Sequence, residues 1–125
     1  MTENEIATHV FKAALEIHRT LGPGLLESTY TECLQYELEQ RNHLVEKQKP
    51  VPLIYEDVKL DIGYRLDLMI EGKFVIEVKA VEAINDVHLA QILTYLKLSD
   101  CRLGMLINFN VALLKYGVKR VVNNL

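Results

Sequence analysis

Two acidic residues and one lysine occupy neighbouring apolar runs, with a spacing that suits cation binding. Asp67 lies in the run 64–70, and Glu77 and Lys79 lie in the run 74–80. The short polar connection between the runs predicts an antiparallel hairpin. Its length places Asp67 directly opposite Glu77, and Lys79 shares their face because alternate residues of a strand point the same way.

Like charges that stand opposite each other in a sheet destabilise it unless something neutralises them. Lys79 supplies part of that neutralisation. A divalent cation would supply more, since carboxylate oxygens are the ligands that Mg²⁺ and Mn²⁺ prefer. The alternative is a solvent-facing hairpin held by salt bridges. The other face of the hairpin is apolar and is expected to be the core, with Leu66, Leu68, Ile70, Phe74, Ile76 and Val78.

The hairpin stands within an order of helices and strands that must position it. Helical periodicity starts after a capping-box pattern at Thr2 and Glu5, and a Gly-Pro-Gly turn separates the first two helices. The expected elements are helices over 3–20, 24–41 and 85–98, an edge strand over 49–55 continuing at 58–61, and strands over 64–70, 74–80, 102–108 and 118–122. This order predicts an α/β fold class with a mixed central sheet flanked by helices.

Length and composition narrow the class of protein. The 125 residues suffice for one compact domain, expected over 1–125, and a hydrophobic share of 50% excludes a disordered chain. No apolar run reaches the roughly 20 residues of a membrane span, and the acidic start resembles no signal peptide. Cys33 and Cys101 lack CxxC spacing, so we expect reduced thiols and a cytoplasmic protein. Unpaired histidine spacing disfavours zinc.

The formal net charge is −3, which by itself gives no reason to expect nucleic acid. The distribution is uneven, because residues 101–125 contain no acid and carry Arg102, Lys115, Lys119 and Arg120. Such a basic segment could contact a phosphate backbone. It could equally be an ordinary solvated surface.

The aspartate of the hairpin followed by Glu77-x-Lys79 resembles the core of the PD-(D/E)XK nuclease superfamily. The segment 24–30, Gly-Leu-Leu-Glu-Ser-Thr-Tyr, matches the motif that names the small bacterial GxxExxY proteins of that superfamily. The resemblance runs over nearly the whole chain and includes His88-x-x-Gln91-x-x-x-Tyr95 and the segment 106–109. It implies a restriction-endonuclease-like αβββαβ core.

The resemblance also implies roles for individual residues. Asp67, Glu77 and the backbone carbonyl of Val78 would hold the catalytic Mg²⁺ or Mn²⁺, with Glu27 as a further ligand. Lys79 would contact the attacking water and the scissile phosphate. Gln91, on the helix after the hairpin, would assist them as a further catalytic residue.

Four more residues are candidates for binding substrate. His88 and Tyr95 form one stripe of a helix with Gln91, at positions i, i+3 and i+7, and this polar side is expected to face the carboxylates. Arg65 shares the face of Asp67 and could bind phosphate. Tyr30 completes the set. Each has a structural alternative: Tyr30, for example, would serve equally as a core aromatic with a satisfied hydroxyl.

The residues and the resemblance together suggest two functions of different classes for this protein. The first is a divalent-metal-dependent nuclease that hydrolyses phosphodiester bonds in DNA or RNA, with specificity from the basic segment, a partner or a homodimer. The second is a metal-binding or partner-binding module that retains the nuclease fold without catalysis, since a fold does not fix a function.

Overall fold

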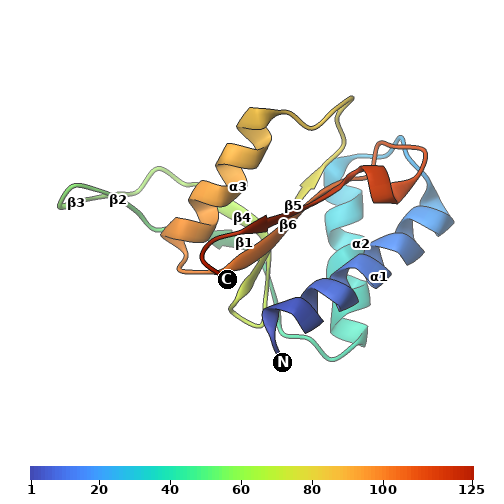
Figure 1. Cartoon of the computed structure of the whole chain (residues 1–125), viewed down its shortest axis with the longest axis horizontal. Coiled ribbons are helices and arrows are strands. Elements are labelled where there is room, and N and C mark those ends of the chain that lie inside the picture. The colour runs from blue at the N-terminus through green and yellow to red at the C-terminus, as the bar shows by residue number, and fades with distance from the viewer.

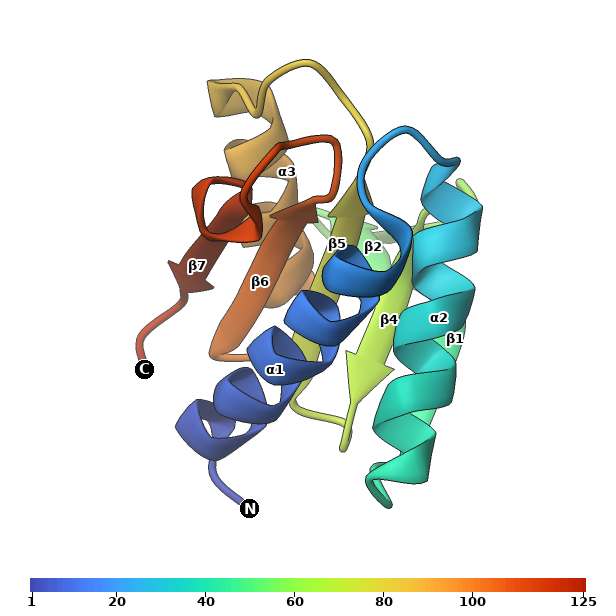
Figure 2. The same cartoon turned by 90° about the vertical axis from the view of Figure 1, so that its right-hand side faces the viewer.

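The computed structural model describes residues 1–125 as three layers (Figures 1 and 2). Helices α1 (Glu3–Leu21) and α2 (Glu27–Gln40) cover one face of a five-stranded sheet, and α3 (Asp86–Leu98) covers the other. The strands run in the order β1 (Val45–Pro50), β4 (Arg65–Ile70), β5 (Phe74–Lys79), β6 (Leu103–Asn108) and β7 (Val118–Val122). Only β5 and β6 are parallel, with α3 as their crossover. The α/β class with a mixed sheet is confirmed.

The helices begin where local chemistry favours them. Thr2 and Glu5 form the expected capping box of α1, in which each backbone N–H donates to the other residue's side chain at 3.2 Å. Asn85 caps α3 by accepting from the N–H of His88 at 2.9 Å. The second helix starts at Glu27 rather than at 24, because Gly24 has a φ of 103°, which no helix residue adopts.

The predicted edge strand over 49–55 is wrong in its extent. Strand β1 begins earlier, at Val45, and ends at Pro50. A separate hairpin follows, formed by β2 (Leu53–Tyr55) and β3 (Val58–Leu60), and it projects from the body of the molecule (Figure 1). Pro52 lies at the break, where its missing N–H prevents a continued ladder.

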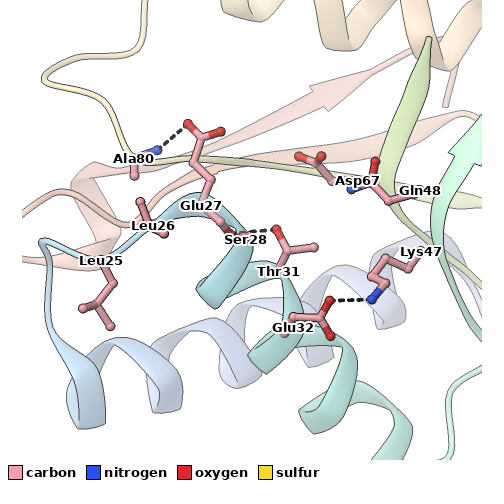
Figure 3. A pocket seen from close by; sticks show the side chains of 10 residues that line it. All are labelled: Leu25, Leu26, Glu27, Ser28, Thr31, Glu32, Lys47, Gln48, Asp67 and Ala80. Atoms are coloured by element: carbon pink, nitrogen blue, oxygen red, sulfur yellow. Dashed lines mark hydrogen bonds and ion pairs between the residues drawn. The ribbon is translucent and has the colours of Figure 1, made fainter. Parts of the chain in front are cut away.

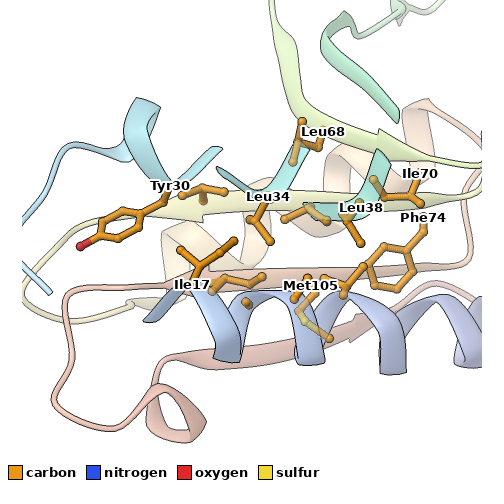
Figure 4. Packing of buried hydrophobic residues seen from close by; sticks show 14 of the residues in the cluster. Ile17, Tyr30, Leu34, Leu38, Leu68, Ile70, Phe74 and Met105 are labelled. Carbon is orange, nitrogen blue, oxygen red and sulfur yellow. The ribbon is translucent and has the colours of Figure 1, made fainter. Parts of the chain in front are cut away.

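Both faces of the sheet are buried, so the hairpin face that was expected to carry the acids also contributes to a core. The larger cluster lies under α1 and α2 and includes Tyr30, Leu68 and Phe74 (Figure 4). The smaller cluster lies under α3 and contains Met69 and Val75 from the hairpin. It also contains Leu66, which was expected on the other face. The carboxylates therefore lie at one end of a sheet covered on both sides.

No helix of the structure combines the length and the apolar character that crossing a bilayer requires.

Candidate functional site

Asp67 and Glu77 meet where the β4–β5 hairpin opens. The ladder runs from Ile70↔Phe74 to Leu68↔Ile76 and stops one residue before the two acids. Beyond this point, hydrogen bonds from backbone N–H groups to carboxylate side chains take the place of backbone-to-backbone hydrogen bonds. The N–H of Asp67 donates to Glu77 Oε2 at 2.8 Å, and the N–H of Val78 donates to Asp67 Oδ2 at 2.8 Å. The reciprocal bonds hold the two carboxylates at the fork between the strands.

The fork is electrostatically strained. Glu77 is only 4% exposed, and its burial, followed by the charge of Asp67, raises its pKa to about 8. Burial is also the main cause that raises the pKa of Asp67. The charge of Lys79 acts against both shifts, but none of the four ion pairs in the structure involves Lys79. The carboxylates are thus short of neutralising charge.

Glu27 comes to the same place from the first turn of α2. Its carboxylate accepts from the N–H of Ala80 at 2.9 Å, just beyond the end of β5. Its charge contributes to the raised pKa values of Asp67 and Glu77. Glu27 and Asp67 line one cavity of about 670 Å³ (Figure 3), together with Leu25, Leu26, Ser28, Thr31, Glu32, Lys47, Gln48 and Ala80.

Tyr30 is placed in the core and not on the cavity. It is fully buried and stacks on Phe109, with ring centroids 4.3 Å apart. Its hydroxyl donates to the Gly22 carbonyl at 2.6 Å and accepts from the N–H of Leu25 at 3.2 Å. These bonds hold the turn that leads into α2 and so help to place Glu27. This position favours the structural alternative for Tyr30 over a substrate contact.

The three polar residues of the predicted stripe on α3, His88, Gln91 and Tyr95, lie in different environments. Tyr95 is buried, and its pKa is raised by that burial and by the charge of Glu77, so it lies towards the carboxylates. Gln91 is exposed and lines a separate cavity of about 350 Å³ with Tyr64 and Tyr95. The Nδ1 atom of His88 accepts from the N–H of Asn85 at 3.1 Å and completes the cap of the helix. Of the three residues of the stripe, Tyr95 is the one whose pKa the charges of the acids raise.

The remaining candidates lie at the margins of the site. Arg65 is exposed at the start of β4, opposite Pro50, and forms no ion pair. Val78 is buried, and its N–H binds Asp67 as described. In the basic segment, Lys119 is level with Leu106 and so with Glu77, two strands away. Arg120 hydrogen-bonds to Asn4 on the opposite face.

Sequence reasoning missed two residues that lie beside the site. Asn108 is 1% exposed at the end of β6, and its side chain bonds both the N–H and the carbonyl of Val81, at 3.1 and 3.0 Å. A polar residue that ends an apolar strand was the available signal. Gln48, beside Asp67 on the cavity wall, has a φ of 53° inside β1. Glutamine has no turn preference, so no local signal indicated it.

The donor chemistry of this site fits a hard divalent cation, although no preformed cage is present. No three His, Cys, Asp or Glu side chains are grouped so as to hold a metal ion. The carboxylates of Asp67, Glu77 and Glu27 nevertheless carry the oxygen atoms that such cations prefer, in a region where positive charge is lacking. Each hairpin carboxylate accepts its backbone N–H through one oxygen, so a cation could bind the carboxylate without displacing that bond.

Comparison with protein families matches residues 4–121 to the PD-(D/E)XK nuclease superfamily. Comparisons with curated proteins and with solved structures found no significant match. The layered α/β architecture, with its mixed five-stranded sheet, is consistent with the restriction-endonuclease-like fold of that superfamily. The acid pair at the open end of the hairpin, with Lys79 two residues beyond Glu77, stands within the matched region. The chain belongs to the PD-(D/E)XK nuclease superfamily.

Proposed function

We propose that the protein is a divalent-metal-dependent nuclease that hydrolyses phosphodiester bonds in nucleic acid. One observation carries the proposal: Asp67 and Glu77 share the open end of the hairpin, where burial raises the pKa of both and the charge of Asp67 raises the pKa of Glu77 further. Metal-dependent phosphodiester hydrolysis uses clustered carboxylates to hold the ion that activates water and offsets charge on the phosphate. The superfamily match supports the same reading.

In this proposal Asp67, Glu77, Glu27 and the carbonyl of Val78 hold Mg²⁺ or Mn²⁺. The bound metal would lower the pKa of a coordinated water and offset negative charge on the reacting phosphate. Lys79 is free of ion pairs, so its ammonium group can contact the phosphate and the water. Tyr95, which is buried near the acids, would contact the substrate through its hydroxyl, and Gln91 would assist from the exposed side of α3.

The substrate class follows from phosphate chemistry and covers both DNA and RNA. We assign the backbone contacts to Arg65 and to the basic segment, in which Lys119 lies level with Glu77. On the motif at 24–30 we further propose that the protein is a member of the GxxExxY group and acts in the cytoplasm. A homodimer is a further source of specificity, since β1 and β7 are edge strands.

The second candidate is a metal-binding or partner-binding module without catalysis. Its support is that the acids already bind backbone N–H groups and form no group of three ligands. In that case the carboxylates serve as structural hydrogen-bond acceptors at the fork.

A cleavage assay on single- and double-stranded DNA and RNA separates the two functions. The wild type is expected to cleave one of these substrates with Mg²⁺ or Mn²⁺ and to stop with EDTA. Lys79→Ala should abolish turnover and keep most of the Mn²⁺ affinity measured by calorimetry, whereas Asp67→Ala should lose both. Cleavage that survives in Lys79→Ala comes from a contaminant, and Mn²⁺ binding without cleavage favours the non-catalytic module.

A further inference from the structure

The alternation of side chains breaks at the same level in two neighbouring strands. In β4, Leu68 packs under α1 and α2, whereas Leu66 packs under α3. In β1, Lys47 pairs with Glu32 on α2, whereas Lys49 lines a cavity with Leu98 of α3. Residues two apart in a regular strand share a face. In each strand, the order in which side chains alternate between the two faces of the sheet therefore shifts once.

The residues at the break are Gln48 and Asp67. The β1–β4 ladder pairs Lys47 with Leu68 and Lys49 with Leu66, and it skips the two residues between them. Because both strands change face at the same level, the register on either side of the break is preserved. The result is that Asp67 turns out of the regular face and lines the cavity with Glu27.

Gln48 carries the conformational cost of this break. Its φ of 53° lies in the left-handed region, which costs free energy for any residue other than glycine. The residue is exposed, so packing does not explain the strain. Its side chain lies beside the Asp67 carboxylate on the cavity wall (Figure 3), and the nearby amide lowers the pKa of Asp67. The backbone conformation and the side chain of Gln48 therefore both affect Asp67.

We propose that Gln48 is a positioning residue for Asp67: its left-handed backbone turns the Asp67 carboxylate into the cavity, and its side-chain amide holds the carboxylate there. The metal-binding consequence rests on the proposed function, in which Asp67 is a metal ligand. Outer partners of this kind set the orientation of metal-binding carboxylates.

Three substitutions separate the backbone contribution from the amide contribution. Gln48→Gly keeps the left-handed conformation and removes the amide. Gln48→Val removes the amide and disfavours the conformation, because a β-branched residue rarely adopts positive φ. Gln48→Asn keeps a shorter amide on a residue that tolerates positive φ. The matched control is Glu56→Gly, which relieves a φ of 56° in the turn between β2 and β3, away from the site.

The first readout needs no metal. The Val78 N–H donates to Asp67, so its hydrogen exchange, measured by NMR with EDTA, reports whether the carboxylate is held. We expect exchange about tenfold faster in Gln48→Gly, faster still in Gln48→Val, and close to wild type in Gln48→Asn and Glu56→Gly. The Ile76 N–H, in the same strand, corrects for general loosening. Unchanged Val78 exchange in both Gln48→Gly and Gln48→Val overturns the inference.

The second readout is Mn²⁺ affinity by titration calorimetry on the same proteins. It is expected to weaken by about tenfold in Gln48→Gly without loss of thermal stability, as for other outer partners of metal ligands. A wild type that binds no Mn²⁺ while Val78 exchange follows the expected order overturns the proposed function and leaves the positioning role supported. Wild-type affinity in Gln48→Val contradicts the positioning role.

Discussion

Glu77 is the residue whose burial conflicts most with its charge. The ordinary glutamate pKa of 4.5 rises to about 8 in the fold, mainly through burial and then through Asp67. Between these two values the native state binds a proton that the unfolded chain has released. The free energy of unfolding must therefore fall as pH rises through this window.

We expect Glu77→Gln to remove that dependence, because glutamine does not titrate and keeps an acceptor for the Asp67 N–H. With EDTA, the variant should gain stability over the wild type as pH rises from 5 to 8, by at most about 1.4 kcal/mol per pH unit. Urea unfolding at several pH values measures the difference. Glu39→Gln, on an exposed position of α2, is the matched control. Equal pH profiles for wild type and Glu77→Gln would refute the raised pKa.

At the scale of elements, the site depends on how the end of β6 is tied to the segment after β5. Asn108 binds both backbone groups of Val81, and the adjacent Ala80 N–H binds Glu27. The carbonyl of Lys79 also accepts from the N–H of Phe109 at 3.0 Å. Helix α2, β5 and β6 thus meet at one junction, and a change in any of them moves Glu27 relative to the hairpin acids.

Asn108→Ala should destabilise the protein by about 2 kcal/mol, because the buried groups of Val81 lose their partners. Chemical denaturation measures the loss, and Mn²⁺ titration is expected to show weaker binding as the junction loosens. The control is Asn110→Ala, whose exposed side chain reaches the same Val81 carbonyl at 3.4 Å. If both alanine variants lose the same small amount of stability, Asn108 is not the anchor of this junction.

For the molecule as a whole, metal binding and folding are linked. A cation that binds the folded site and not the unfolded chain stabilises by RT ln(1 + [L]/Kd), about 2.7 kcal/mol at a hundredfold excess over Kd. We expect millimolar Mn²⁺ to raise the wild-type Tm by several degrees. Asp67→Asn should be more stable than wild type with EDTA, since it removes one repelling charge, and should lose most of the shift.

Scanning calorimetry of both proteins, with EDTA and with Mn²⁺, tests the two halves of this prediction together. A wild type without a metal shift, combined with a less stable Asp67→Asn, would mean that the carboxylates form a structural hydrogen-bond network. Ca²⁺ at the same concentration serves as the comparison for a nonspecific charge effect.

The charge distribution also acts at the scale of the whole molecule. Neutralising Lys115, Lys119 and Arg120 together should weaken nucleic-acid binding and reduce the slope of log K against log salt, because each phosphate contact releases counterions. Fluorescence anisotropy over a salt series measures the slope. Arg41→Gln, at the far end of α2 where Arg41 pairs with Glu37, is the control. An unchanged slope in the triple variant would place the nucleic-acid surface elsewhere.

Much of the fold was predictable because its causes are local. The periodicity and cap of α1 gave bounds within one residue of those observed, and 118–122 was predicted to the residue. The short hairpin connection likewise determined the register up to Leu68↔Ile76, beyond which the Asp67 N–H bonds the Glu77 carboxylate. The α/β class with a mixed sheet follows from the same local patterns. These features depend on residues that are close together in the chain.

The tertiary structure alone decided how the site is assembled. Glu27 and Ala80 are 53 residues apart, and their bond exists because α2 packs against the end of β5. Packing also placed Tyr30 in the core, where sequence left two roles open. The face change at Gln48 and Asp67 is accompanied by a positive φ that glutamine does not signal, at a position that the ladder between the strands skips. Alternation is a local rule, so its breakdown, which turns Asp67 into the cavity, was decided by contacts between strands that no single segment encodes.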